Sequence, residues 1–306
     1  MKLTYDIHEI TPYINWPYYY FAWQVKDPAE QDKLKVDALK RLEQLEGKYQ
    51  TYAVFRLLPA NSEGDDILIW NVEESDNPLA MSESCLPTKN ESNLPTKGES
   101  NLPTKGESNL QQEEAYRLPM LRQQAVSPSL CLADFIRPLS SGKEDTIGLF
   151  STSVSIGLET DFAYDDFLRM QTQLLSDRLA EATAEKMHQE VRTKYWGYAK
   201  DEHLTMDELH AEKFQGIRPA VGYPSMPDTS VNFLIDEMLD MKQIGIRLTE
   251  SGAMKPHASV SGLMIAHKQA SYFLLGKIGE DQLNDYARRR GIPVEMMRKF
   301  IGASVK

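Results

Sequence analysis

The sequence predicts an α+β protein in which a mainly antiparallel, bent β-sheet is flanked by helices. Strand-like runs lie on both sides of one long stretch with helical periodicity, and this helix is expected over residues 158–198. Short polar turns join neighbouring strand-like runs, as in hairpins. Strands and helices do not alternate in the manner of βαβ units, so a parallel sheet is not expected.

The other elements follow from apolar periodicity and turn residues. Residues 27–49 form the first expected helix, with leucine and alanine at three- to four-residue spacing and Gly47 at its end. The expected strands cover residues 51–57, 66–72, 129–136, 146–154, 258–267 and 271–278, the last two as a hairpin. The remaining expected helices cover residues 205–214, 230–245 and 280–290, followed by a helix in which Pro293 is the first residue.

The composition is typical of a globular protein and excludes several functional classes. Of the 306 residues, 41% are hydrophobic and 26% are charged, which excludes global disorder. Asp and Glu number 45 against 34 Lys and Arg, and the net charge of −11 repels nucleic-acid backbones and anionic membranes. No apolar run is long enough to cross a bilayer. The chain has two cysteines and no secretory signal, so the expected compartment is the cytoplasm.

An octapeptide repeat interrupts the chain. LPTKNESN at Leu86 is followed by LPTKGESN at Leu94 and again at Leu102. One leucine per unit cannot bury enough apolar surface to offset the entropy of ordering the backbone. Residues 76–113 are therefore expected to be a disordered insert within a single domain spanning residues 1–306. The insert is either a tolerated expansion of a surface loop or a linker that binds a partner.

Titratable residues gather on one face of the expected long helix. Asp177, Glu181 and His188 lie on the side opposite its apolar stripe. Asp177 has no lysine or arginine four residues further on. Like charges at this spacing repel each other. This face therefore requires either solvent or a cationic or hydrogen-bonding partner.

The run QGIRPAVGYPSMP, which begins at residue 215, is the most informative short segment. Its prolines stiffen the backbone, and Gly222 would let a ligand approach closely. Arg218 could bind a carboxylate through two hydrogen bonds. The segment is either a loop that binds a ligand with a carboxylate and a planar ring, or a rigid connector with a surface arginine.

Common catalytic signatures are absent from the sequence. There is no Walker A loop, no GxGxxG motif after a strand, no GxSxG elbow and no HExxH motif. The six histidines do not have paired ligand spacing, so no metal site is expected.

Several long runs resemble the activation domain of cobalamin-dependent methionine synthase. They are ITPYINWPYYYFAW, CLADFIRP, DRLAEATAEKMHQEVRTKYWGYAKDEHLTMDELHAEKFQGI, RPAVGYPSMPD and LTESGAMKPHASVSGLMIAHKQASYF. The resemblance covers nearly the whole chain apart from the repeat, and its most specific parts are the RPxxGYP and YWGY motifs. In that family the domain binds S-adenosylmethionine, whose methyl group reactivates oxidised cobalamin after reduction by flavodoxin.

The resemblance implies a set of ligand contacts. Arg218 would hold the carboxylate of S-adenosylmethionine, and Glu181 would reach the cationic end of the ligand. The other implied binding residues are Ala220, Gly222 and Tyr223, which would line the ligand, and Tyr272 and Phe273, which would flank it. Where the family has an aspartate that contacts the ligand, this chain has Asn15, which should weaken ammonium binding by roughly 1–2 kcal/mol.

The resemblance also implies partners. Asp177 would contact the histidine that leaves cobalt when the cobalamin-carrying part docks. Homocysteine, folate and cobalamin would be bound by a separate methionine synthase core, and a flavodoxin-type protein would donate the electron. Because the chain starts at Met1 and ends soon after its last expected helix, it is expected to act in trans as a methyltransferase component. Two alternatives are an S-adenosylmethionine-binding adaptor for a different corrinoid protein and a remnant that no longer binds ligand.

Overall fold

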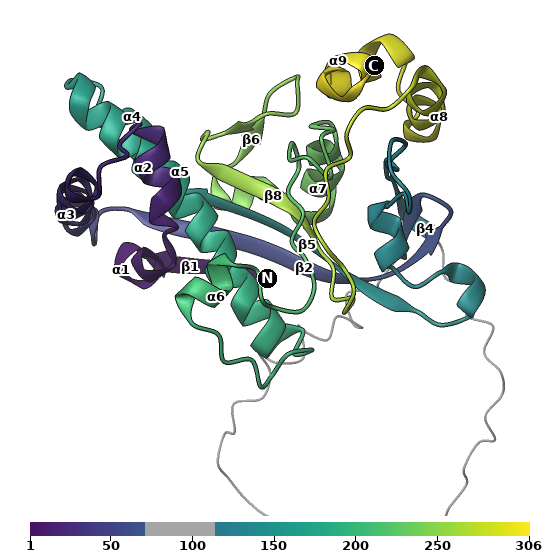
Figure 1. Ribbon diagram of the computed structural model, residues 1–306, viewed down its shortest axis with the longest axis horizontal. Helices are drawn as coiled ribbons and strands as arrows, with labels where there is room; N and C mark the ends of the chain where they lie inside the picture. The colour runs from purple at the N-terminus through teal and green to yellow at the C-terminus, as the bar shows by residue number, and fades with distance from the viewer. Residues whose placement is uncertain (71–113) are drawn as a thin grey trace, which may run out of the picture.

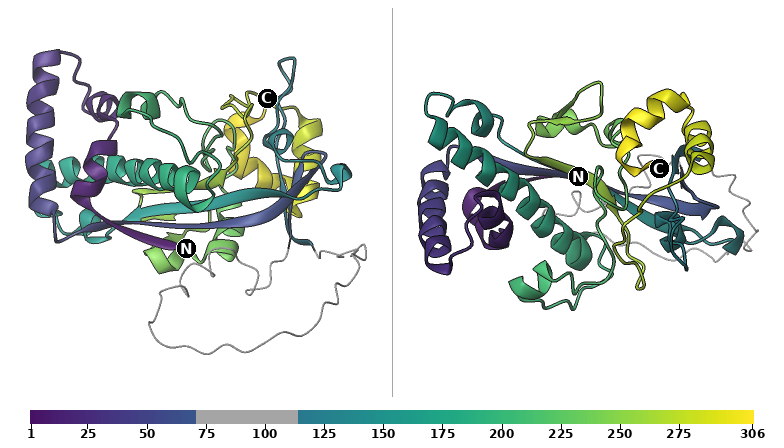
Figure 2. Two further views of the ribbon diagram at one scale, coloured as in Figure 1. Left: turned by 90° about the horizontal axis from the view of Figure 1, so that it is seen from below. Right: turned by 45° about the horizontal axis from the view of Figure 1, so that its top comes forward.

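The computed structural model describes residues 1–70 and 114–306 as a bent antiparallel sheet with helices on both faces (Figures 1 and 2). The α+β prediction is confirmed. The repeat insert expected at residues 76–113 lies outside the described residues. The strands are β1 (Lys2–Asp6), β2 (Gln50–Glu63), β3 (Asp66–Trp70), β4 (Glu114–Pro119), β5 (Asp145–Val154) and β8 (Ser259–Met264), with a separate pair formed by β6 (Arg247–Leu248) and β7 (Met254–Lys255).

The long strand β2 organises the sheet. The strand order is β4-β3-β2-β5-β8, and β2 pairs with β5 along most of its length. On its other edge, the first half of β2 pairs with β1 and the second half pairs with β3. Gly64, with a φ of 59°, allows the tight turn between β2 and β3. One bent strand therefore connects the two halves of the sheet.

Alternate residues of β2 and β5 separate two hydrophobic cores. Phe55 and Phe150 point to the face covered by the long helix, whereas Val54 and Leu149 point to the opposite face. Because both faces are covered, burial is nearly continuous along β5 and includes the polar residues Ser151, Thr152 and Ser153. A third cluster of buried residues joins the two C-terminal helices.

The helices of the described residues are mostly short, with two exceptions. They are α1 (Ile7–Ile10), α2 (Trp16–Ala22), α3 (Pro28–Leu45), α4 (Gly157–Thr160), α5 (Asp166–Glu190), α6 (Met206–His210), α7 (Val231–Leu239), α8 (Glu280–Arg290) and α9 (Val294–Ile301). Helix α5 continues into a π-helical turn, η6 (Val191–Tyr195), for a total of 30 residues. It crosses one face of the sheet, and α7 packs on the other (Figure 2).

Helix α5 begins later than the helix predicted over residues 158–198. The Asp165 side chain accepts a hydrogen bond from the backbone N–H of Leu168 and starts α5 there. Residues 157–160 form the separate helix α4. Tyr164, which lies within the predicted helix range, precedes α5 and is exposed, while Leu175 and Leu179 are buried.

Two predicted strands are wrong. Residues 129–136 contain a 3₁₀ turn, η4 (Leu132–Phe135), because the Asp134 carboxylate accepts a hydrogen bond from the backbone N–H of Cys131. Residues 271–278 do not pair with β8, so the predicted hairpin does not form. The outer edge of β8 is instead covered by residues 217–221.

Other boundaries differ by a few residues. The first long helix ends at Leu45, before Gly47. The helix expected over 205–214 begins with a capping box of Thr205 and Glu208 and ends earlier, at His210. The helix expected over 230–245 stops at Leu239 because Asp240 adopts a left-handed conformation, with φ of 50°. Pro293 precedes α9 as its N-cap and is not its first residue.

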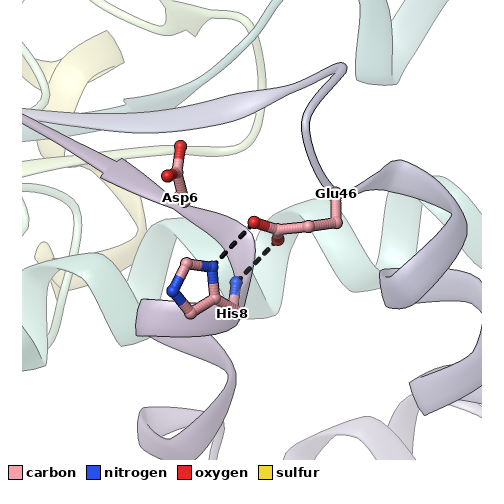
Figure 3. Close-up of side chains that lie close together, drawn as sticks. All are labelled: Asp6, His8 and Glu46. Atoms are coloured by element: carbon pink, nitrogen blue, oxygen red, sulfur yellow. Dashed lines mark hydrogen bonds and ion pairs between the residues drawn. The ribbon is translucent and has the colours of Figure 1, made fainter.

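One cluster of potential metal ligands occurs among the described residues, where β1 meets α1 and the end of α3 (Figure 3). It consists of Asp6, His8 and Glu46. Glu46 accepts hydrogen bonds from both the backbone N–H of His8 and its Nδ1, at 2.9 and 2.7 Å. Asp6 accepts one from the Gln50 side chain. These contacts join the N-terminal strand to α3, and none of the three residues lines a cavity described below.

None of the helices in the described parts of the chain is both long and apolar enough to span a membrane.

The packing of α5 on the sheet predicts a large effect for Leu179→Ala. Leu179 is fully buried, so this change should lower the free energy of unfolding by about 2–5 kcal/mol through lost burial and the cavity left behind. Leu168→Ala, at a half-buried position of the same helix, is the matched control and should cost much less. Equal effects in guanidinium denaturation would contradict this packing.

Candidate functional site

A cavity of about 570 Å³ lies between α5 and the loops that cross it. Its volume is in the range typical of small-molecule sites. Three groups of segments form its walls: the start of α2, the middle of α5, and the loops after α6 and β8. The lining residues are Tyr13, Asn15, Tyr18, Arg178, Glu181, Ala182, Glu185, Leu209, His210, Glu212, Arg218, Pro219, Ala220, Tyr223, Pro224, Ser225, Tyr272, Phe273 and Leu274.

The loop that carries Arg218 is attached to the edge of β8. Ile217 exchanges two backbone hydrogen bonds with Ile265, at 2.9 and 3.0 Å, and Leu263 donates to the Pro219 carbonyl at 3.0 Å. Gly262 makes this approach possible, since a Cβ there would lie 2.2 Å from the Pro219 carbonyl oxygen. The pairing holds the loop against the sheet and directs Arg218 toward α5.

Arg218 forms a buried ion pair with Glu185 of α5. Its Nη2 lies 2.8 Å from Glu185 Oε2, and the two side chains are 10% and 14% exposed. Burial lowers the pKa of Arg218, but the nearby Glu185 carboxylate, Tyr272 and Glu181 raise it more, so the guanidinium stays charged. The Tyr272 hydroxyl accepts a hydrogen bond from the backbone N–H of Arg218, at 2.8 Å.

Glu181 lies one helical turn before Glu185 and accepts a hydrogen bond from the Tyr223 hydroxyl. Burial and the Glu181 carboxylate raise the pKa of Tyr223, which therefore stays protonated at neutral pH. The charged face of α5 predicted from the sequence is thus covered here by the 218–225 loop. Glu181 thus has a hydrogen-bonding partner, and one oxygen of Glu185 has a cationic partner.

The start of α2 forms the wall beside Glu181. Asn15 is the N-cap residue of α2, but its side chain makes no capping hydrogen bond. Tyr13 is held in place by a hydrogen bond from its hydroxyl to Gln189 and by one between its carbonyl and His210 Nε2, at 2.7 and 3.1 Å. Lys186 lies over the Tyr13 ring, 5.5 Å from its centroid. Asn15 is therefore presented to the cavity by a firmly held turn.

The structure brings most of the predicted site residues together. Asn15, Glu181, Arg218, Ala220, Tyr223, Tyr272 and Phe273 all line the cavity. Gly222 does not line it, although its φ of 86° allows the turn that places Tyr223. Asp177 does not line it either. His188, predicted to share the charged face, is completely buried.

Asp177 lies on α5 outside the cavity and half-buried. Burial raises the pKa of its carboxyl, and the neighbouring Glu159 and Glu181 raise it further, against the lowering effect of Arg178 and His257. The structure therefore keeps a carboxylate at a position where its charge is unfavourable.

The sequence interpretation missed three charged residues of the cavity, Arg178, Glu185 and Glu212, and its histidine, His210. Glu185 had a detectable signal, because it lies four residues after Glu181 and shares its helix face. No local pattern marks Glu212, which follows the short helix α6 with a φ of 56°.

Charge and shape indicate what the cavity can bind. One guanidinium, Arg218, can hold an anionic group, and the carboxylates of Glu181 and Glu212 can hold cationic ones. Tyr272 and Phe273 add aromatic surface. The arrangement fits a small molecule that has a carboxylate, positive charge and a flat apolar part.

The environment of Asp177 predicts a pH-dependent gain in stability from Asp177→Asn. Because the folded protein raises the pKa of this carboxyl above its ordinary value of 3.8, ionisation favours the unfolded state as pH rises. The variant should be more stable than wild type at pH 7, and the difference should shrink toward pH 3.8. Urea denaturation at several pH values measures this. Asp37→Asn, at a side chain 66% exposed, is the control and should change little. A gain that is independent of pH would contradict the desolvation of Asp177.

Comparisons with known proteins identify the family of the chain. The family model described as the activation domain of vitamin B12 dependent methionine synthase matches residues 6–291. A solved structure described as the MetH reactivation domain bound to AdoHcy is 32% identical, with a TM-score of 0.83, and the match covers 100% of this chain and 90% of that one. The chain therefore belongs to the activation domain family of vitamin B12 dependent methionine synthase.

Proposed function

We propose that the chain binds S-adenosylmethionine in the cavity beside α5 and supports the reductive methylation of cob(II)alamin on a methionine synthase core. The observation that carries the proposal is the buried Arg218 guanidinium, which faces a cavity rich in carboxylates. The similar reactivation domain bound to AdoHcy supports the same ligand class.

The residues of the cavity fit this ligand. Arg218 Nε is buried without a hydrogen-bond partner among the described residues, which leaves a donor for the ligand carboxylate. Glu181 is available to the cationic end of the ligand, once Tyr223 releases it. Asn15, on the adjacent wall, offers an amide oxygen where the family has a carboxylate.

The chemistry needs positioning from the protein and no general base. When bound, S-adenosylmethionine supplies the methyl group, and a flavodoxin-type donor supplies the one electron that cob(II)alamin requires. This chain would hold the carboxylate and the cationic end at two separate walls and thereby orient the sulfonium methyl toward the cavity mouth. Asp177, outside the cavity, would contact the cobalamin-carrying partner.

An adaptor that binds S-adenosylmethionine for a different corrinoid protein is the second candidate. Asn15 favours it, because an amide at this wall removes a charge that would hold the ligand ammonium. Only a reaction with a methionine synthase core separates the two candidates.

Ligand binding predicts a specific loss in Arg218→Ala. Isothermal titration should show one S-adenosylmethionine site per chain, and Arg218→Ala should weaken it by about 10- to 100-fold, the value of a lost charge-assisted hydrogen bond. Arg137→Ala, at an exposed arginine away from the cavity, is the matched control and should bind as wild type. Heat equal to the buffer blank at millimolar ligand with the wild type would eliminate both candidate functions.

Reactivation predicts different defects for Arg218→Ala and Asp177→Ala. The chain is mixed with a cobalamin-loaded methionine synthase core, reduced flavodoxin and S-adenosylmethionine, and the corrinoid spectrum is followed. Cob(II)alamin should convert to methylcobalamin only when this chain is present. Asp177→Ala should slow the conversion without changing ligand affinity, whereas Arg218→Ala should slow it most at ligand concentrations near the wild-type Kd and recover as the ligand concentration rises. Tight ligand binding without methylation by any core would leave the adaptor as the function.

A further inference from the structure

Beneath the cavity, the inner face of α5 and η6 carries buried polar groups that the proposed function does not use. Glu185, His188 and Arg192 follow one another at separations of three and four residues, a spacing that places their side chains in one row. The side chains of His188 and Arg192 are completely buried. Arg192 lies in the π-helical turn, where Trp196 donates a backbone hydrogen bond to the Val191 carbonyl at 2.8 Å.

Each residue of this row has a buried polar atom without a protein partner among the described residues. These atoms are Glu185 Oε1, His188 Nδ1 and Nε2, and Arg192 Nη1, and Arg218 Nε shares this property. The other two guanidinium nitrogens of Arg192 are paired: Nη2 and Nε donate hydrogen bonds to the Glu202 carboxylate, at 2.7 and 2.9 Å. Buried polar atoms without partners cost stability and are rare, so a group of them at one place calls for an explanation.

Phe214 holds the row together from the loop side. Its ring lies edge-on to His188, with 5.1 Å between centroids, and the Arg192 guanidinium lies 4.1 Å from its centroid. Burial and the positive charges of Arg192 and Arg218 lower the pKa of His188, so the imidazole is neutral. A neutral imidazole has one donor and one acceptor. It can therefore satisfy a carboxylate oxygen on one side and a guanidinium on the other.

We propose that His188 is a positioning residue of the cavity, which holds the Glu185 carboxylate when the carboxylate of the ligand binds Arg218. The inference rests on the proposed function. In the structure, Glu185 Oε2 is paired with Arg218. A second carboxylate at the same guanidinium repels Glu185, and His188 offers it a neutral N–H one helical turn away. Arg192 Nη1 then donates to the other ring nitrogen and sets the tautomer.

The test compares two ligands and two variants. S-adenosylmethionine carries the carboxylate, and methylthioadenosine lacks it. His188→Leu fills the space without polar atoms and should weaken S-adenosylmethionine binding about tenfold, the cost of leaving a buried group unsatisfied, while methylthioadenosine binding stays unchanged. His188→Gln retains a donor and an acceptor and should bind both ligands within about threefold of wild type.

Isothermal titration separates this role from simple packing. Equal loss for both ligands, or equal loss in His188→Leu and His188→Gln, would mean that His188 only fills space and would overturn the proposal. Unchanged S-adenosylmethionine affinity in His188→Leu would also overturn it. If His188→Leu does not fold, Glu185→Gln combined with His188→Met, which also lacks the ring N–H, decides the question, because coupled residues give a non-additive loss and independent ones an additive loss. If the wild type binds methylthioadenosine but not S-adenosylmethionine, the proposed function is wrong. The role of His188 is then overturned as well, because it rests on that function.

Discussion

The candidate site depends on one close backbone contact, where residues 216–221 lie on the outer edge of β8. Two glycines permit it, since a Cβ on Gly216 would lie 2.3 Å from the Ile265 carbonyl oxygen and one on Gly262 would meet Pro219 at 2.2 Å. The contact covers a sheet edge that would otherwise expose unpaired backbone groups. The same contact determines where Arg218 meets Glu185. Both the walls of the cavity and the charge inside the cavity therefore depend on this contact.

Helix α5 combines packing and chemistry in one element. Leu175 and Leu179 bind the helix to the sheet, and the carboxylates on its other side face the cavity and its surroundings. Asp177 lies where burial opposes its charge, which is a cost in stability that function can explain. The π-helical turn at the end of α5 carries Arg192, the buried partner of Glu202, and such turns often occur at functional sites.

Periodicity and turn residues were sufficient for elements with a strong local signal. Helices α3 and α8 and strand β3 agree with the ranges predicted for them, 27–49, 280–290 and 66–72. The errors occur where a competing interaction decides the conformation. The hydrogen bond from the Cys131 N–H to Asp134 favours a 3₁₀ turn within residues 129–136. Residues 217–221 pair with the outer edge of β8, so residues 271–278 cannot pair there. The first competitor is a side-chain hydrogen bond that strand-like periodicity does not report, and the second lies outside the segment that it displaces.

The sequence by itself determined the fold class, the family resemblance and the amphipathic faces, because these depend on the order and spacing of residues along the chain. Tertiary structure alone decided which charges meet. Arg218 and Glu185 lie 33 residues apart, and Tyr223 and Glu181 lie 42 apart. Whether a carboxylate faces solvent, a tyrosine or a guanidinium depends on where a distant loop packs. The loop's position is set by the free energy of burial and hydrogen bonding, which involves residues far apart in the sequence.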